Sequence, residues 1–324
     1  MPRIGLTGVT GHLGSLIARE LQQSIAQSKR ATAPEDFDEP IIRYIARSMP
    51  KLITSLSRGL SDAPWTETIE ARKASYADDR LAAKALTGVD TLLMVSAGES
   101  PTRVQEHKAF IDAASKAGVQ HIVYISFYGA DENASFLLAR DHGATEEYIK
   151  NSGITYTFIR DNFYAEFFTE LVLEYGEVRG PAGDGVCSMV AREDIARVAA
   201  HVLADPRSYA NETLNMTGPE ELSMADVVRI ASEELETHIP YIDETEDEAF
   251  ASRAQYDAPD WMVAAWVSTY TAIKNGETAG LTSDVQRVTG RAPLSFLEVL
   301  RADIARQEEQ KEERKEAQKE AVRA

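Results

Sequence analysis

Three glycines stand near the beginning of the chain, three residues apart in the segment TGVTGHLG. Gly8, Gly11 and Gly14 lie between a predicted strand, Pro2–Thr7, and an amphipathic segment with apolar residues at three-to-four spacing. Such glycines allow a tight turn, a close approach of the backbone to a pyrophosphate, and close packing of a helix on a strand. The helix would present free N–H groups to that anion. The loop therefore predicts a dinucleotide-binding α/β fold.

Short β-rich segments alternate with helical ones over the first 160 residues, which is typical of a parallel sheet covered on both faces. The predicted strands are Pro2–Thr7, Ile41–Ala46, Thr68–Ala74, Thr91–Ser96, His121–Ser126 and Thr155–Arg160. The clearest predicted helices begin near Gly11, run from Thr102 to Lys116, and run from Ala134 to Asn151. We therefore predict a doubly wound parallel sheet of the Rossmann type in residues 1–160.

Two polar segments interrupt this alternation. Ser24–Pro40 has no hydrophobic period and is predicted to be a surface loop between the first helix and the second strand. Met49–Trp65 is predicted to hold a short helix, near Lys51–Arg58, followed by a loop.

Residues 161–303 are predicted to form a smaller C-terminal α/β lobe, in which residues 186–206 pack back onto the first domain. Its expected elements are a helix Arg192–Leu203, a strand Glu212–Met216, a helix Met224–Leu235 capped by Ser223, and an aromatic-rich helix Trp261–Asn275. Residues 304–324 form a charged tail with Glu–Lys and Glu–Arg pairs, for which a solvated helix and a frayed segment both stay open.

The overall charge restricts the class of partner. The chain has 34 Lys and Arg against 52 Asp and Glu, a net charge of −18, which disfavours nucleic acid and anionic membrane surfaces. A single cysteine, Cys187, excludes an internal disulfide and suits a reducing compartment. We find no apolar segment of membrane-spanning length, no signal-peptide pattern and no metal-ligand spacing among the six histidines. We therefore expect a cytoplasmic protein that binds a small molecule, with a homodimer left open.

The end of the second strand indicates which dinucleotide would bind. Folds that prefer NAD carry an acidic residue there, which binds the ribose 2′-hydroxyl. This strand ends in Arg47 and Ser48, with Lys51 close behind. A guanidinium suits a 2′-phosphate through bidentate, charge-assisted contacts. We therefore predict NADP(H), with a solvated Arg47 as the alternative interpretation.

With these residues in view, the chain resembles the NmrA-like group of atypical short-chain dehydrogenases/reductases, and within it the bacterial NADPH:quinone oxidoreductases. The resemblance covers roughly residues 3–300, apart from Ser24–Pro40. It depends on the segments TGVTGHLG, IARS, VSAGES with Arg103 and His107 after it, AGVQHIVYIS, HGATEEYIKNSGITYTFIRDNFYAE, VAREDIARVAAHVL, LNMTGPEELSMADV and TGRAPLSFLEVL.

The resemblance implies a set of cofactor-binding residues. The pyrophosphate would contact the glycine loop, through Gly8, Thr10, Gly11, His12, Leu13 and Gly14. Arg47 and Lys51 would face the adenosine phosphate, and the middle of the cofactor would lie along Val95, Ser96, Ala97 and Gly98. Asp161, Asn162 and Phe163 would lie beside the nicotinamide and the substrate, together with Tyr164.

The resemblance also identifies what is missing. Standard short-chain reductases use a Ser, together with a Tyr and a Lys four residues apart on a helix, where the Tyr gives the proton. Ser126 is present, but His142 stands at the position of the Lys and Leu138 at that of the Tyr. The candidate catalytic residues are therefore His142, Tyr164 and Ser126, although His142 and Tyr164 could also be packing residues.

A missing proton donor favours an acceptor whose reduction needs little proton assistance, because conjugation stabilises the oxygens of a reduced quinone. We therefore expect an NADP(H)-binding oxidoreductase that transfers hydride to a quinone or a similar acceptor. Two alternatives stay open: a regulatory protein that senses NADP(H) without turnover and signals to a protein partner, and a reductase or isomerase for an unrelated small molecule.

Overall fold

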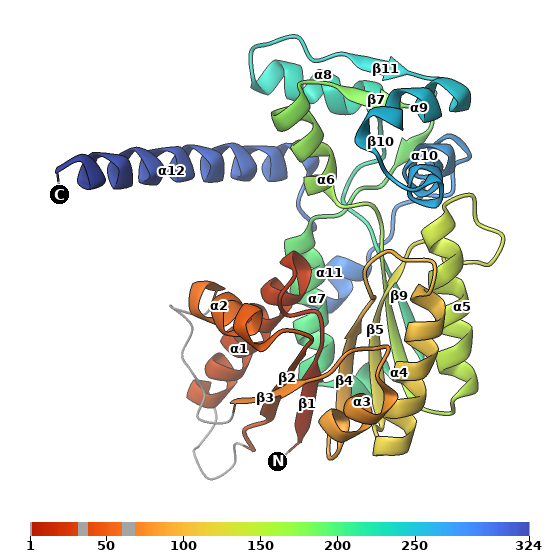
Figure 1. Ribbon diagram of the computed structural model, residues 1–324, viewed down its shortest axis with the longest axis vertical. Helices are drawn as coiled ribbons and strands as arrows, with labels where there is room; N and C mark the ends of the chain where they lie inside the picture. Colours follow the sequence, from red (N-terminus) through yellow and green to blue (C-terminus); the bar gives the residue numbers. More distant parts are fainter. Residues whose placement is uncertain (1, 32–37, 60–68, 324) are drawn as a thin grey trace.

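The computed structural model describes residues 2–31, 38–59 and 69–323. Seven strands form one parallel sheet in the order β3-β2-β1-β4-β5-β6-β9 (Figure 1). They are β1 Arg3–Leu6, β2 Ile41–Ala46, β3 Ile69–Lys73, β4 Thr91–Val95, β5 His121–Phe127, β6 Thr155–Asp161 and β9 Glu212–Met216. The strand order reverses between β1 and β4, and this is the position where open α/β sheets form a crevice at their carboxyl edge.

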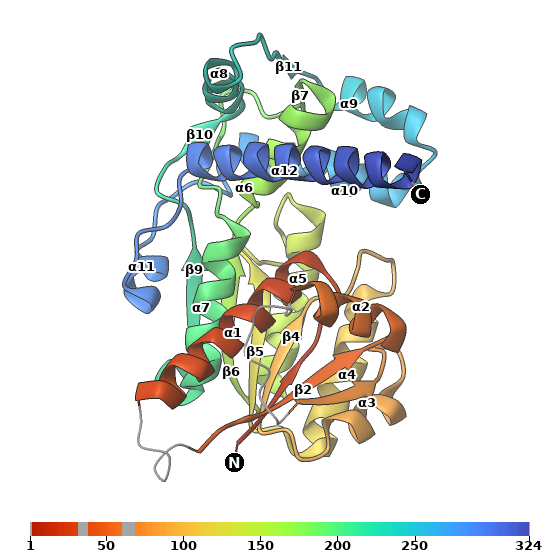
Figure 2. The ribbon, with the colours of Figure 1, turned by 90° about the vertical axis from the view of Figure 1, so that its left-hand side faces the viewer.

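Helices cover both faces of this sheet (Figures 1 and 2). One face is covered by α1 His12–Ala31, α2 Met49–Gly59, α7 Arg192–Ala204 and α11 Asp284–Thr289, and the other by α3 Asp79–Leu86, α4 Arg103–Ala117 and α5 Leu137–Asn151. Side chains alternate accordingly along the strands, since Leu93 packs on the α1 side while Leu92 and Met94 pack on the α4 side. The predicted doubly wound Rossmann fold is confirmed.

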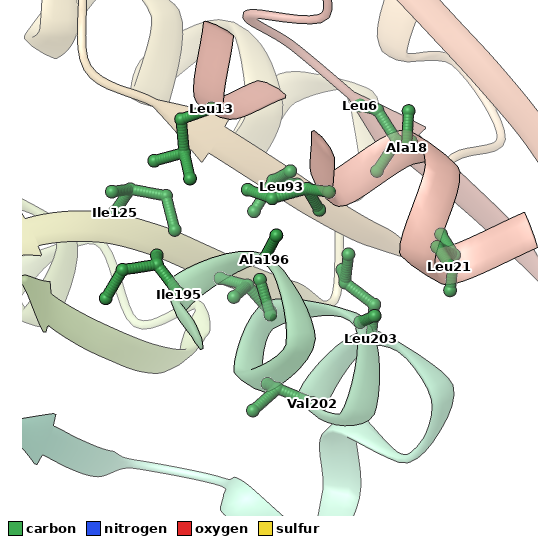
Figure 3. Close-up of a cluster of buried hydrophobic side chains, with 14 of the residues drawn as sticks. Leu6, Leu13, Ala18, Leu21, Leu93, Ile125, Ile195, Ala196, Val202 and Leu203 are labelled. Atoms are coloured by element: carbon green, nitrogen blue, oxygen red, sulfur yellow. The ribbon is translucent and has the colours of Figure 1, made fainter. Parts of the chain in front are cut away.

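The amphipathic stripe of α1 is buried against α7. Figure 3 shows Leu13, Ala18 and Leu21 of α1 in one cluster with side chains of α7 and of the sheet, among them Ala196 and Leu93. Leu21 and Leu93 are completely buried. Burial of a leucine side chain contributes about 1.5–3 kcal/mol, so this contact is a large part of the core on this face.

The prediction of a loop from Ser24 to Pro40 is wrong over its first part, because α1 continues to Ala31. The apolar stripe does not end at Leu21: Ile25 is buried four residues later. Gln22 is buried as well, and its Nε2 donates to Tyr44 Oη of β2 at 2.5 Å. The last turn, AQSKRA, consists mostly of good helix formers. Residues 32–37 lie outside the described residues.

The helix predicted near Lys51–Arg58 is confirmed as α2, and the loop predicted after it falls mostly on residues 60–68, outside the described residues. The strand predicted at Glu212–Met216 is β9, which pairs in parallel with β6 from Thr157↔Glu212 to Asp161↔Met216. The main sheet therefore takes its seventh strand from beyond residue 160. The division of the chain into domains at residue 160 stays a prediction.

The remaining elements form a lobe above the carboxyl edge of the sheet (Figure 1). They are α6 Ala165–Glu170, a π-helical turn Leu171–Tyr175, β7 Val178–Gly180, β8 Val186–Cys187, β10 Leu222–Ser223, α8 Met224–Glu234, β11 Tyr241–Asp243, α9 Glu246–Arg253 and α10 Asp260–Lys274. Two short sheets, β10-β8 and β11-β7, belong to it. The predicted cap is present, because Ser223 and Asp226 form a reciprocal capping box at the start of α8.

The charged tail belongs to α12, Phe296–Arg323, which extends away from the body (Figure 1). Phe296, Val299 and Leu300 anchor its first turns in the core of the lobe. Of the two interpretations left open for the tail, the helix is correct. Within the described ranges, no helix has both the length and the apolar character needed to cross a membrane.

Candidate functional site

The glycine loop between β1 and α1 has the geometry that its spacing predicts. Gly8 has a φ of +70°, and a Cβ on it would stand 2.6 Å from the Cβ of Val95. A Cβ on Gly14 would stand 2.2 Å from the carbonyl oxygen of Gly8, so α1 approaches the loop too closely for any side chain there. Gly11 differs: its N–H donates to Gly8 O at 2.9 Å, and a Cβ on it would meet that oxygen alone, at 3.3 Å. The outer side of Gly11 is therefore open to a ligand.

The loop after β4 is held by buried side chains of α4. The Ala97 N–H donates to His107 Nε2 at 2.8 Å, and the Ala97 carbonyl accepts from Arg103 Nε at 3.0 Å. At the strand end, the Val95 N–H donates to Thr7 Oγ1 at 3.0 Å, which ties this loop to β1. Hydrogen bonds therefore hold this segment, which contains the predicted cofactor residues Val95, Ser96, Ala97 and Gly98, at two of its four residues.

Arg47 lies exposed after β2, on the same edge of the sheet. Among the residues that the structure describes, neither Arg47 nor Lys51 forms an ion pair. The charge of Arg47 reaches Tyr76, where it opposes the rise in the pKa of that phenol that burial causes. The helix α2 rests against the glycine loop, since Ser55 Oγ donates to Val9 O at 3.0 Å. Arg47 is therefore a cation without an ion-pair partner in the described part of the chain, and it lies near Tyr76, which contacts Thr7 at the start of the glycine loop.

A cleft of about 680 Å³ lies between the carboxyl ends of β4, β5 and β6 and the C-terminal lobe. Its lining is rich in aromatic side chains: Phe127, Phe136, Phe163, Tyr164, Phe167, Tyr175, Tyr256, Trp266 and Tyr270. Three cations also line it, namely Arg179, Arg192 and Arg253. Arg179 and Arg253 are both paired with Glu244, and Arg192 Nη1 lies 3.7 Å from Glu170 Oε1. This composition suits a planar, apolar ligand.

The structure brings eight of the predicted site residues together in this cleft: Leu13, Val95, Ser96, His142, Asp161, Asn162, Phe163 and Tyr164. The others do not line it: Gly8, Thr10, Gly11, His12, Gly14, Arg47, Lys51, Ala97, Gly98 and Ser126. Most of these lie on the glycine loop and the neighbouring strand ends, where a dinucleotide would extend. Their predicted roles stay predictions.

Ser126 points away from the cleft. Its neighbours Ile125 and Phe127 line the cleft, and successive side chains of a strand face opposite sides of the sheet. Ser126 Oγ instead donates to Glu146 Oε1 of α5 at 2.5 Å, and Glu146 also accepts from Arg160 Nη2 at 2.6 Å. All the polar contacts of this serine are structural, so the geometry argues against the predicted catalytic role.

His142 reaches the cleft, but both of its ring nitrogens have partners. Nε2 lies 3.0 Å from Arg103 Nη2, and Nδ1 lies 2.9 Å from Tyr124 Oη. Because a guanidinium can only donate, Nε2 is the acceptor and Nδ1 carries the hydrogen. Burial and the charge of Arg103 hold the pKa of His142 well below its usual range. The predicted role of His142 as a proton source stays untested, and its contacts favour a positioning role.

At the end of β6, Tyr164 contacts two other cleft residues. Tyr164 Oη donates a short hydrogen bond to Asp161 Oδ2. The guanidinium of Arg192, at the start of α7, lies 4.9 Å from the centre of the Tyr164 ring. Burial, opposed by the hydrogen bond from Tyr164, raises the pKa of Asp161 to about 7. This carboxyl group can therefore exchange a proton near neutral pH.

The side-chain amide of Asn162 forms hydrogen bonds within the protein. Its Nδ2 donates to Thr278 O at 2.9 Å and its Oδ1 accepts from the Phe163 N–H at 2.8 Å, so the amide ties β6 to the 276–279 turn. The Phe163 ring packs at 5.0 Å against the rings of Phe127 and Phe136. In the described part of the chain, no group of His, Cys, Asp and Glu is arranged to hold a metal ion.

Several lining residues escaped the sequence reasoning. Tyr256, Trp266 and Tyr270 come from the last third of the chain, where only the aromatic character of one helix was apparent. The sequence indicates Arg192 only as the first residue of a helix. Arg103 carried part of the resemblance, yet nothing in its sequence context indicates that it is a buried cation in contact with His142. Tertiary packing alone places these side chains.

The glycine loop, the doubly wound parallel sheet and the cleft at the carboxyl ends of its strands define an α/β protein of the Rossmann class. The chain belongs to the NmrA-like family, whose model matches residues 2–253. The family resemblance drawn from the sequence is confirmed.

Two similar proteins are oxidoreductases by name. The chain is 28% identical over 262 residues to quinone oxidoreductase 2 of Escherichia coli, covering 80% of this chain and 84% of that one. It is 27% identical over 303 residues to the NAD(P)H azoreductase of Xenophilus azovorans, covering 93% and 97%.

Two solved structures have the same fold. The NADPH-dependent quinone oxidoreductase of Escherichia coli, complexed with NADPH, superposes with a TM-score of 0.78 at 25% identity over 93% of this chain and 99% of that one. The triphenylmethane reductase of Citrobacter sp., complexed with NADP(H), gives a TM-score of 0.76 at 27% identity over 93% and 100%.

Proposed function

We propose that the protein is an NADP(H)-dependent oxidoreductase that transfers hydride to a quinone or a similar conjugated acceptor. The observation that carries this proposal is the position of the aromatic cleft: it lies at the carboxyl ends of β4, β5 and β6, next to the loop after β4 and the start of α1. A dinucleotide lying along that edge would place its reactive end beside an acceptor in the cleft. The oxidoreductase relatives and the NADP(H)-bound structures support the proposal.

The residues present fit the dinucleotide. At Gly11, beside the start of α1, only Gly8 O lies within 4 Å of the position that a Cβ would take, and a pyrophosphate would bind there to free N–H groups. Arg47 is a cation without a carboxylate partner in the described ranges, as a 2′-phosphate requires. The segment from Val95 to Gly98, held by hydrogen bonds at Val95 and Ala97, would support the middle of the cofactor. When bound, NADPH would supply the hydride.

The cleft fits an aromatic acceptor for two reasons. Its volume falls within the range of about 300–1,000 Å³ that is typical of ligand pockets, and flat side chains line it. Leu138 also lines it, at the position where the standard pattern has a tyrosine. An aliphatic group there can pack against a ring but cannot donate a proton. This favours acceptors that conjugation stabilises after reduction.

The test is NADPH consumption with a series of quinones, and with simple aldehydes and ketones for comparison. We expect turnover with quinones and little with the simple carbonyls. Equal rates with both would contradict the acceptor class. Tight NADPH binding without consumption by any acceptor would instead favour the regulatory, NADP(H)-sensing function.

A matched pair of variants locates the acceptor. Trp266 lines the cleft, whereas Trp261, on the same helix α10, does not. We expect Trp266→Ala to raise the KM for the quinone about tenfold, the effect of losing roughly 1.4 kcal/mol of stacking and burial, with the Kd for NADPH unchanged. Trp261→Ala should change neither constant. A quinone that binds elsewhere would show the same KM in both variants.

A further inference from the structure

We propose that Tyr164 delivers the proton to the reduced acceptor and that Asp161, acting through Tyr164, stores this proton, with Arg192 as the counter-charge. Tyr164 is then the catalytic residue, and Asp161 and Arg192 are positioning residues. This inference rests on the proposed function. It adds the source of the proton, because the chain lacks the Tyr–Lys pair that donates the proton in standard short-chain reductases.

Three segments bring these residues to one place. Asp161 ends β6, Tyr164 immediately precedes α6, and Arg192 begins α7. Backbone hydrogen bonds join the segments: the Ala165 N–H donates to Val190 O at 3.0 Å, and the Val190 N–H donates to Phe163 O at 3.0 Å. All three side chains line the cleft. The arrangement is therefore built into the fold at the acceptor site.

The hydrogen bond between Tyr164 and Asp161 allows two states. With Asp161 as a carboxylate, the phenol hydrogen of Tyr164 is held by Oδ2 and is not available to a ligand. With Asp161 protonated, the carboxyl can donate to the phenol oxygen, and the phenol hydrogen is free to turn toward an acceptor in the cleft. The protonation state of Asp161 thus decides whether Tyr164 can donate to a ligand.

The step balances in protons and electrons. Addition of hydride to a quinone reduces it by two electrons and leaves a hydroquinone monoanion. The Tyr164 O–H bond breaks as its proton moves to the anionic oxygen, and the Asp161 proton moves to the Tyr164 oxygen. Asp161 remains as a carboxylate, which takes a proton from water before the next turnover.

The charged groups around the pair are consistent with this role. Burial raises the pKa of Asp161 to about 7, while Arg103 from α4 and Arg192 from α7 lower it. Tyr164 faces the same Arg192 and, from α6, Glu166. Arg192 also forms an ion pair with Glu170 of α6, with its Nη1 3.7 Å from Oε1. Arg192 lies over the ring, where its charge stabilises negative charge that develops on the phenol oxygen during transfer.

The test is the pH dependence of kcat with a quinone substrate. We expect kcat of the wild type to fall above about pH 7, because the carboxylate form of Asp161 retains the phenol hydrogen. Asp161→Asn should abolish this titration. Tyr164→Phe should lower kcat about 10- to 100-fold, at or below the 10²–10⁴ of a full general acid, with the Kd for NADPH unchanged.

The chain offers a matched control pair. Tyr148 Oη donates to Asp112 Oδ1 at 2.9 Å on the outer surface of α5 and α4, away from the cleft. Tyr148→Phe and Asp112→Asn should leave kcat and its pH profile unchanged. A wild-type pH profile in Asp161→Asn would overturn the inference while leaving the proposed function standing, whereas a wild type without quinone turnover would remove both.

An infrared titration of the resting protein tests the proton store without turnover and without cofactor. We expect a protonated-carboxyl band that disappears around pH 7 in the wild type and is absent from Asp161→Asn. Asp161→Glu, which restores a carboxyl group, should recover the band and part of the pH dependence if the asparagine variant folds poorly. Absence of such a band from the wild type would also overturn the inference.

Discussion

The N–H of Ala97 donates to Nε2 of His107 at 2.8 Å, so a buried imidazole holds the loop at the carboxyl end of β4. The Nδ1 hydrogen of His107 points to Thr145 Oγ1, 2.8 Å away on α5. The imidazole can accept from Ala97 only while it is neutral. Burial, with the charge of Arg103, lowers the pKa of His107 to about 3, which keeps the ring in that form.

This linkage predicts a loss of stability on mild acidification. Below the ordinary histidine pKa of about 6.5 the unfolded chain takes up a proton at His107 that the folded protein excludes. His107 should therefore lower the free energy of unfolding by about 1.4 kcal/mol for each pH unit below that value. Urea unfolding at pH 7, 6 and 5 gives the free energy of unfolding at each pH. This free energy should change less with pH in His107→Gln than in the wild type. His201→Gln, on the exposed side of α7, is the control. The same pH dependence of the free energy of unfolding in both variants would contradict the assignment of this effect to His107.

Arg103 should matter for cofactor binding although it lies beneath the loop. It holds the Ala97 carbonyl and His142 at once, and lysine cannot make both contacts. Arg103→Lys should weaken NADPH binding about tenfold, the equivalent of about 1.4 kcal/mol, as measured by calorimetry. Arg140→Lys removes a comparable contact, from Arg140 Nε to Ala134 O at 2.7 Å, and should leave the affinity unchanged. Equal affinities in all three proteins would show that the loop needs no such support.

Arg47 should set the preference between the two dinucleotides. Arg47→Glu removes a charge-assisted contact and adds repulsion, so NADP(H) binding should weaken by about 2–3 kcal/mol, while NAD(H) binding should change little. Arg207→Glu, on an exposed turn after α7, changes the net charge equally and serves as the control. Equal affinity of the wild type for both cofactors would refute this prediction.

The glycine loop gives two contrasting variants. Gly11→Val should abolish dinucleotide binding at a smaller cost in stability than Gly14→Ala, because a Cβ on Gly11 would meet only Gly8 O, at 3.3 Å. Gly14→Ala should destabilise the protein, since its Cβ would stand 2.2 Å from a backbone oxygen. Thermal unfolding and calorimetry separate the two effects. Retained affinity in Gly11→Val would place the phosphates elsewhere.

Sequence patterns predict those features of the fold that depend on a single helix, strand or turn. The glycine loop, the strand alternation and the Ser223 cap depend on residues close together in sequence. The sequence does not predict the continuation of α1 to Ala31, because Ile25 is the one large apolar residue of Ser24–Ala31 and its burial depends on tertiary packing. The place of β9 beside β6 is likewise set by packing rather than by its own sequence.

For some residues of the site the sequence predicts the position but not the contacts, and for others it predicts neither. Asp161 and Tyr164 follow a predicted strand, so their place at the carboxyl edge could be expected, but their mutual hydrogen bond could not. The orientation of Ser126 could have been read from strand alternation, since its apolar neighbours Ile125 and Phe127 face the other side. Trp266 reaches the cleft from a helix more than 100 residues further along the chain, through tertiary packing alone.

The apolar side of α1 is buried by α7, which the ribosome synthesises much later. Between Ala31, the last residue of α1, and Arg192, the first of α7, the chain number rises by 192 − 31 = 161. At about 5–20 residues per second, ribosomes need roughly 8–30 s to make that stretch. Throughout this interval the apolar stripe of Ile17 and Leu21 emerges without its final neighbour, which makes it a binding site for chaperones on the nascent chain. A stalled chain ending near residue 160 should therefore bind chaperones or aggregate, although it already contains six of the seven strands of the sheet.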